Sequence, residues 1–329
     1  MLRSPVVVFA ARAALFLALQ FGICAALVPL AYRREQRDYM AATIDKHARL
    51  DAQRGARRLF IAGGSSAAFG FDSAAIEAAT GRAVTNLGLH AALGLPFILA
   101  EAESAAGPGD VVWLSPEFHF YWCEPELAEE MWAYLCARPA GFADLRYEPV
   151  KTLLDHGPFQ FAGHVVRAVV PWLRFGTKPA GKLYARALFE EHGDIVPRVG
   201  EKPKRPLGID VNDSPIQEER LLASLQLLAR VVRSCERKGA EVRIVLPPLH
   251  EGLMRGYAAR VERVVAELER AFPGQVIGDA GSVAEPDDHF FDTPLHLTRE
   301  AAKARTQRVL AAAGIVGGEA GAEAARSGR

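Results

Sequence analysis

Short apolar runs alternate with longer amphipathic segments along most of the chain. Apolar runs bounded by turn residues predict buried β-strands at 57–62, 83–89, 110–115, 241–246 and 275–278. Apolar residues three and four positions apart, with helix start and stop signals, predict helices at 73–80, 96–106, 217–238, 257–272 and 298–313. Strands alternating with helices indicate an α/β fold, a three-layer sandwich around a parallel sheet with right-handed crossovers.

One apolar segment is much longer than the others. No charged residue occurs from Ala13 to Tyr32, and this length at about 1.5 Å per residue spans the ~30 Å hydrocarbon core of a bilayer. Arg12, Arg33 and Arg34 flank the segment as interfacial residues. We therefore predict a retained membrane anchor in residues 1–34. The alternatives are a cleaved signal peptide, for which no clean small-residue cleavage site is present, and a buried helix of a soluble protein.

The rest of the chain divides into four parts. Residues 35–56 are charged and Ala-rich, and we interpret them as a helical or flexible stalk. The α/β domain is predicted over 57–313, interrupted by an aromatic and Pro-rich insertion at about 118–215 that we expect to be mostly helical, with a polar loop in its later part. The tail, 314–329, is rich in Gly, Ala and Glu and is expected to be disordered.

Composition excludes several classes of protein. Half of the 329 residues are apolar, which rules out wholesale disorder. The 39 Lys and Arg residues balance 39 Asp and Glu residues, so a general nucleic-acid binder is not expected. Four cysteines with no C-x-x-C pair argue against a disulfide scaffold and a structural zinc site, and the histidines show no ligand spacing, so no metal is assigned. Whether Cys123 and Cys136 pair stays open.

Polar residues with catalytic potential follow the predicted strands. Ligands bind at the carboxyl ends of the strands in an open parallel sheet. The ends of the predicted strands carry Ser65 after Gly63-Gly64, then Asn86 and Gly88, then Glu117, while Asp292 and His296 precede the last helix. A serine, a histidine and an acid meeting at one edge of a sheet form the arrangement that nucleophilic acyl transfer requires.

Each of these residues has a candidate role. Ser65 is the predicted nucleophile, His296 its base and Asp292 the acid that orients the base, because a serine hydroxyl needs such a base at neutral pH. The backbone amides of Ser65 and Gly88 are the predicted oxyanion donors. Four further residues are pocket candidates: Ser66, which is also the alternative nucleophile, Asn86, Glu117 and His119.

Structural roles are the alternatives to these assignments. Ser65 can serve only as a cap for the helix after the first strand. Asn86 and Gly88 can be ordinary turn residues, and His296 can be a capping or surface histidine. Two other folds are disfavoured: the α/β-hydrolase elbow follows several strands rather than the first, and GGSSAAFG does not fit the G-x-G-x-x-G dinucleotide motif.

With these blocks in this order, the chain resembles the SGNH/GDSL hydrolase superfamily. Gly63-Gly64-Ser65 matches the first block, Gly88 the second, and Asp292 with His296 the last, over roughly residues 57–125 and 217–312. The resemblance is closest to membrane-anchored branches that handle acyl groups on cell-envelope polymers. It implies an SGNH/flavodoxin-like fold, no cofactor, and an esterase or O-acyltransferase acting on an acylated envelope carbohydrate or lipid.

Three departures from the family pattern keep a second hypothesis open. Gly64 replaces the aspartate of the first block, the third block has Leu114-Ser115-Pro116-Glu117 where an Asn is usual, and the last block is D-x-x-x-H rather than D-x-x-H. A lost oxyanion donor costs about 10²–10³ in rate. The alternative is therefore a catalytically degenerate domain that binds an envelope polymer or a membrane acyltransferase partner.

The side of the membrane on which the domain lies is predicted differently by two arguments. Lys and Arg residues are more frequent after the apolar segment than before it, which favours a cytoplasmic domain. The resemblance implies a domain outside the cytoplasmic (inner) membrane, where envelope polymers are. We expect export, because long domains often cross regardless of moderate flanking charge and Arg3 and Arg12 can anchor the N-terminus inside.

Overall fold

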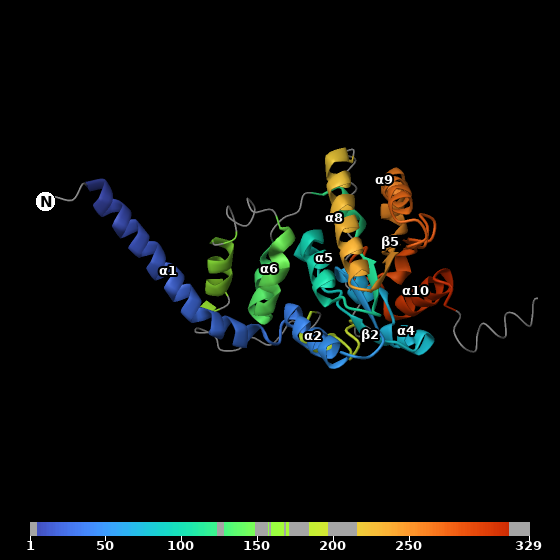
Figure 1. Ribbon diagram of the computed structural model, residues 1–329, viewed down its shortest axis with the longest axis horizontal. Helices are drawn as coiled ribbons and strands as arrows, with labels where there is room; N and C mark the ends of the chain where they lie inside the picture. Colours follow the sequence, from blue (N-terminus) through green and yellow to red (C-terminus); the bar gives the residue numbers. More distant parts are fainter. Residues whose placement is uncertain are drawn as a thin grey trace, which may run out of the picture.

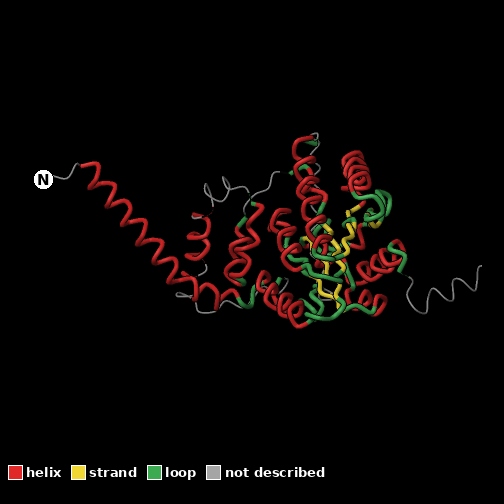
Figure 2. The backbone as a smooth tube through the Cα atoms, in the orientation of Figure 1, coloured by secondary structure: helices red, strands yellow, loops and turns green. Residues whose placement is uncertain are grey.

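The structure, a computed structural model, describes residues 5–123, 128–148, 157, 159–167, 169–170, 184–196 and 216–315. A sheet lies among surrounding helices, and the long helix α1 (Pro5–Glu35) extends away from them (Figures 1 and 2). The chain is thus an α/β protein, as the sequence predicted.

The main sheet has five parallel strands in the order β2-β1-β3-β4-β6. These strands are β1 (Arg58–Gly63), β2 (Ala83–Asn86), β3 (Val111–Ser115), β4 (Glu241–Val245) and β6 (Val276–Ile277). All five predicted strands are confirmed, although the second is shorter than expected. Because every strand runs in the same direction, the residues that follow them gather at one edge of the sheet.

The larger helices follow the predictions, with differences at their ends. They are α4 (Ser73–Thr80), α5 (Gly94–Ala105), α8 (Glu218–Arg237), α9 (Glu251–Ala271) and α10 (Arg299–Ala312). Gly81 ends α4, with a φ of +62°, and the Thr298 hydroxyl caps α10, which are the stop and start signals of these two helices. Helix α9 begins earlier than predicted because the side chain of His250 caps it by accepting a hydrogen bond from the N–H of Gly252, a role more usual for Ser, Thr, Asp or Asn.

Shorter elements complete the domain. The sequence did not predict α3 (Ser65–Gly70), which is too short to show a helical repeat. A second, two-stranded sheet pairs β5 (Leu249–His250) with β7 (Ala284–Glu285). The single turns of 3-10 helix in the domain are η2 (Ala91–Leu93), η3 (Phe118–Tyr121) and η6 (Asp287–His289).

Alternate side chains of the strands face two different hydrophobic clusters. In β1, Phe60 and Ala62 belong to the larger cluster, to which α5, α8 and α9 contribute, whereas Leu59 and Ile61 belong to the smaller cluster with residues of α4 and α10. The strands are therefore buried on both faces, as their continuous apolar runs indicated.

Helix α1 has the dimensions of a membrane span. Its residues Pro5–Ala31 are long and apolar enough to cross a bilayer, judged by length and composition. Large apolar side chains such as Phe9, Phe16 and Ile23 are exposed along it. The apolar helix thus begins earlier than the predicted Ala13 and ends close to the predicted Tyr32.

The segment interpreted as a stalk is helical but packs against the domain. Tyr39 in η1 (Tyr39–Ala41) is buried and its hydroxyl donates a 2.6 Å hydrogen bond to the carbonyl of Leu89. In α2 (Ala42–Ala52), Leu50 belongs to the larger hydrophobic cluster and Lys46 is buried. The segment is charged and Ala-rich, yet Lys46 and Leu50 reach the interior from one face of α2.

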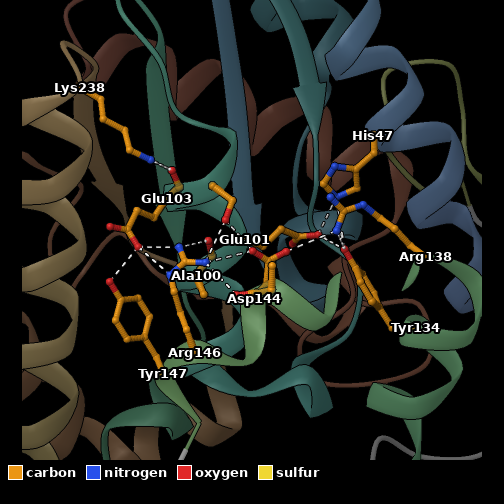
Figure 3. A network of polar contacts seen from close by, with 12 residues as sticks. His47, Ala100, Glu101, Glu103, Tyr134, Arg138, Asp144, Arg146, Tyr147 and Lys238 are labelled. Atoms are coloured by element: carbon orange, nitrogen blue, oxygen red, sulfur yellow. Dashed lines mark hydrogen bonds and ion pairs between the residues drawn. The ribbon is translucent and has the colours of Figure 1, made fainter. Parts of the chain in front are cut away.

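The described part of the insertion is tied to α5 by a network of charged and polar side chains (Figure 3). Glu101 accepts a hydrogen bond from the Tyr134 hydroxyl of α6 (Glu129–Ala137) and pairs with His47 of α2 at 2.9 Å. Burial alone would raise the pKa of Glu101, but the hydrogen bonds from His47 and Tyr134, together with the charges of His47 and Arg138, hold that pKa below its ordinary value. Glu103 pairs with Arg146 of η4 (Pro139–Tyr147) at 2.6 Å.

The expected helical character of the insertion is met in η3, α6 and η4 and in the helical residues 159–167 and 169–170. The segment 184–196, which contains η5 (Arg186–Leu188), returns to the sheet. Cys136 is a buried free thiol, so the pairing with Cys123 that the sequence left open is not formed. The predicted polar loop at 197–215 and nearly all of the predicted tail lie outside the described residues.

Candidate active site

Asp292 and His296 come together in the loop between η6 and α10. The carboxylate Oδ1 of Asp292 lies 2.8 Å from Nδ1 of His296, and both side chains are largely buried. A 2.8 Å hydrogen bond from the N–H of Phe291 to the carbonyl of His296 closes the loop, so the additional residue in D-x-x-x-H is accommodated. A proton on Nδ1 directed at Asp292 leaves Nε2 as the basic nitrogen of His296.

Tyr184 holds the other oxygen of Asp292. Its hydroxyl donates a hydrogen bond to Oδ2 of Asp292 and lies 3.4 Å from Nδ1 of His296. Burial alone would raise the pKa of Asp292, but the hydrogen bonds from His296 and Tyr184 keep it below its ordinary value. Burial also raises the pKa of Tyr184, which therefore stays a donor. No sequence signal points to Tyr184, because it lies in a segment without periodicity.

The ring of His296 stacks on Phe69. The two ring centroids are 4.1 Å apart, and the planes differ by only 5°. Phe69 lies one turn after Ser65 in α3, and residues four apart share one face of a helix. This stacking sets the histidine against the helix that Ser65 begins.

Ser65 does not cap a helix. Gly64 occupies the N-cap position of α3 without a side-chain bond, and Ser65 is the first helical residue. The Ser65 side chain is nearly buried, and within the described residues its hydroxyl makes no hydrogen bond, including none to His296. As the first residue of α3, Ser65 also has no intrahelical acceptor for its N–H. Among the residues that the structure describes, the hydroxyl and the amide of Ser65 are therefore both uncommitted.

Glu117 binds the start of α3. Its carboxylate, fully buried, accepts hydrogen bonds from the N–H of Gly64 at 3.2 Å, and from the N–H and hydroxyl of Ser66 at 3.1 and 2.9 Å. A Cβ added to Gly64 would lie only 2.3 Å from Oε1 of Glu117. Glu117 thus occupies the space that a side chain at position 64 would need. Two departures from the family pattern, at positions 64 and 117, meet at this point.

The loop after β2 packs against the same helix. A Cβ on Gly88 would lie 2.7 Å from Cβ of Ala67, which shows how closely the loop approaches α3. The N–H of Gly88, a predicted oxyanion donor, donates a 2.8 Å hydrogen bond to Oδ1 of Asn86. The amide nitrogen of Asn86 binds the carbonyl of Ala67 at 2.9 Å and Oδ1 of Asp194 at 2.7 Å. Asn86 therefore acts as a link between the loop and α3.

His119 is the least constrained of the pocket candidates. It lies in η3, directly after Glu117 and Phe118, and is half-buried. Burial lowers its pKa, although the nearby charge of Glu117 raises it. The other three pocket candidates are buried and hydrogen-bonded: Ser66 to Glu117, and Asn86 to Asp194. Within the described residues, no three His, Cys, Asp or Glu side chains gather to hold a metal ion.

Lys46, to which no sequence signal points, supports the loop after β2. Its ammonium group donates to three carbonyls: Asn86 at 2.8 Å, Gly88 at 2.7 Å and Gly193 at 2.5 Å. Burial lowers the pKa of Lys46 to about 7, against the opposing charge of Asp194. Lys46 therefore fixes the backbone on both sides of Leu87, beside the proposed oxyanion donor.

We expect Lys46→Met to lower the free energy of unfolding by about 1–3 kcal/mol, because three buried carbonyls lose their donor. The loss should grow from pH 7 to pH 9.5. The folded-state pKa of about 7 lies below the ordinary lysine value, so the unfolded chain binds more protons over this range and the native chain gains stability as the pH rises. Urea unfolding of the full chain in detergent micelles measures both effects. Lys303→Met, at a half-exposed lysine of α10, is the control, and equal losses in both variants would contradict the assignment.

A comparison with protein-family models finds none that matches the chain, and a comparison with curated proteins finds no match.

Proposed function

We propose that this chain is a serine-dependent ester hydrolase or O-acyltransferase of the SGNH type. The observation that carries the proposal is His296: its Nδ1 is bonded to Asp292, while its ring stacks on Phe69 of the helix that begins at Ser65. Nucleophilic acyl transfer requires an oriented histidine and an available serine. Here the histidine packs against the helix that the serine begins, and within the described residues the serine hydroxyl makes no hydrogen bond.

The proposed reaction proceeds through an acyl-enzyme. The Ser65 oxygen bonds to the acyl carbonyl carbon and its proton moves to Nε2 of His296, while Asp292 stabilises the resulting imidazolium. The Ser65 N–H stabilises the oxyanion, joined by Gly88 when the Gly88 N–H shares or leaves its bond to Asn86. The ester oxygen then departs with the proton from His296. Water or a sugar hydroxyl, deprotonated by His296, accepts the acyl group and releases Ser65.

The strand order supports the finer part of the fold assignment. The order β2-β1-β3-β4-β6 corresponds to the flavodoxin-like order 2-1-3-4-5, in which ligands bind at the carboxyl ends of the strands. We therefore propose a three-layer SGNH/flavodoxin-like sandwich, with the site at its usual edge.

We also propose that α1 is a single-pass anchor in the cytoplasmic (inner) membrane and that the domain lies outside it, where acylated envelope carbohydrates or lipids and a membrane acyltransferase partner would be met. The exposed apolar side chains of α1 support the anchor. In paired fusions after α10, we expect a reporter active only outside to work and one fluorescent only inside to stay dark. The reverse result would place the domain in the cytoplasm and exclude envelope polymers as substrates.

The principal test is covalent labelling of the full chain with a serine-directed fluorophosphonate. We expect wild-type protein and Ser66→Ala to label and Ser65→Ala not to label, because only the Ser65 oxygen is proposed to attack the probe. Ser66→Ala is the matched control, since the neighbouring hydroxyl is bonded to Glu117. Labelling that persists in Ser65→Ala but disappears in Ser66→Ala would move the nucleophile by one residue.

A binding domain without catalysis is the second candidate. Two observations favour it. Within the described residues, the Ser65 hydroxyl and His296 are not hydrogen-bonded to each other, and the N–H of Gly88 is already bonded to Asn86. This candidate predicts that the wild-type chain does not label at all. It also predicts that Ser65→Ala leaves binding of an acylated polymer unchanged.

A further inference from the structure

A helix of the insertion lies beside the last turns of α1. Its described residues are 159–167 and 169–170, and we name them the insertion helix. Val169 is buried against Ala31 of α1, with Leu27 and Leu30 packed around this contact. In Figure 1 the insertion helix, drawn in yellow-green, lies between α1 and α6.

The insertion helix is apolar on two faces. One face turns inward: Val165 and Val169 are buried, and Phe161 makes an edge contact with the ring of Trp132 in α6 at 5.6 Å. The opposite face carries Phe159, Val166 and Val170, which are 76%, 44% and 54% exposed. Seven and four positions separate these three residues, so they form one stripe along the helix.

The position of this stripe along α1 indicates its depth in a bilayer. The apolar part of α1 has 27 residues, or about 40 Å at 1.5 Å per residue, which exceeds the ~30 Å hydrocarbon core of a bilayer. The ends of α1 therefore extend into the interfacial layers. Because the insertion helix contacts residues 27–31, its stripe lies at the level of the interface nearer the domain.

The polar groups beside the stripe fit such a position. Arg167 is exposed next to Val166 and pairs with Glu129 of α6 at 3.1 Å. A helix that presents aromatic and branched apolar side chains with a flanking cation is typical of segments that lie in the plane of the interface. The exposed surface of α1 is apolar as well, with Phe21 and Ile23 about half exposed.

We propose that the insertion helix is a second membrane contact, which inserts Phe159, Val166 and Val170 into the headgroup and upper acyl layer of the bilayer beside α1. The inference rests on the proposed anchor and not on the proposed catalysis. It gives the domain two attachment points, so that the domain is seated against the lipid surface instead of swinging on a single helix. Such seating suits a site that takes acyl groups from a membrane-bound donor or lipid.

The test is lipid quenching of tryptophans added to the full chain in nanodiscs of phosphatidylethanolamine and phosphatidylglycerol. Phe159→Trp and, separately, Val170→Trp report on the stripe, and exposure at both positions leaves room for the indole. Phe16→Trp reports on the middle of α1. Glu300→Trp, at an exposed position of α10, is the control, because α10 lies far from α1 (Figure 1).

We expect the added fluorescence at 159 and 170 to be quenched by lipids brominated near the headgroup end of the acyl chains and to be shielded from aqueous iodide. The fluorescence at 16 should be quenched by deeper bromines, and that at 300 by iodide alone. Iodide quenching at 159 and 170, with lipid quenching retained at 16, would overturn the seating while the anchor stands. Loss of lipid quenching at 16 would overturn both. Shielding from lipid and iodide together would instead assign the stripe to a second copy of the chain.

Discussion

We expect His296→Ala to lower kcat/KM for a soluble ester such as p-nitrophenyl acetate by on the order of 10³ or more. The substitution removes the group proposed to accept the Ser65 proton, and members of a catalytic triad act as a unit. Tyr184→Phe should cost less, because Asp292 keeps its bond to His296 when the Tyr184 hydroxyl is lost. Steady-state rates of the full chain in detergent micelles measure both.

The control is His289→Ala. This histidine pairs with Glu285 at 2.8 Å, outside the site, so its loss should leave the rate unchanged. A rate for His296→Ala that equals that of His289→Ala would remove His296 from the mechanism. The full chain is needed in all these measurements, because Tyr39 and Lys46 precede the predicted domain and are buried against it.

Local sequence signals predicted the parts of the fold that depend on near neighbours. The strand 110–115 is a continuous apolar run, and Gly81 ends its helix in a conformation that glycine adopts without strain. The pairing of Asp292 with His296 could also be predicted, because both residues lie in one loop. In each case, the residues that carry the signal lie within a few positions of each other in the sequence.

The contacts that the sequence did not predict join distant segments. Tyr184 reaches Asp292 across 108 positions, and Lys46 reaches Gly193 across 147. Neither residue stands in a motif or a periodic pattern, since each is one polar residue on an otherwise ordinary element. Lys46 lies in the segment that the sequence predicts as a helical or flexible stalk, and charged residues are rarely buried unless they are paired. Its three carbonyl acceptors provide that pairing only after the chain folds.

The departures at positions 64 and 117 are likewise connected only in space. In the family pattern an acid occupies position 64 and an Asn follows the third strand. Here the acid is Glu117, which follows the end of β3, and its carboxylate fills the space above Gly64 while binding the N–H groups of Gly64 and Ser66. Under the proposed SGNH assignment, we interpret this as an exchange: the negative charge at the start of α3 is kept, but the segment after β3 supplies it. A carboxylate there also favours the helix terminus electrostatically.

This exchange makes a quantitative prediction. Gly64→Asp should lower the free energy of unfolding by about 3–5 kcal/mol, because a second carboxylate would be buried against Glu117 without a partner. Glu117→Asn should also destabilise, since Ser66 loses a charged acceptor. The double variant Gly64→Asp/Glu117→Asn, which removes the opposing carboxylate, should be more stable than Gly64→Asp alone. Urea unfolding of the four proteins, followed by circular dichroism in detergent micelles, gives the coupling energy. Losses that add to within about 0.5 kcal/mol would mean that the two positions are independent and that no exchange has taken place.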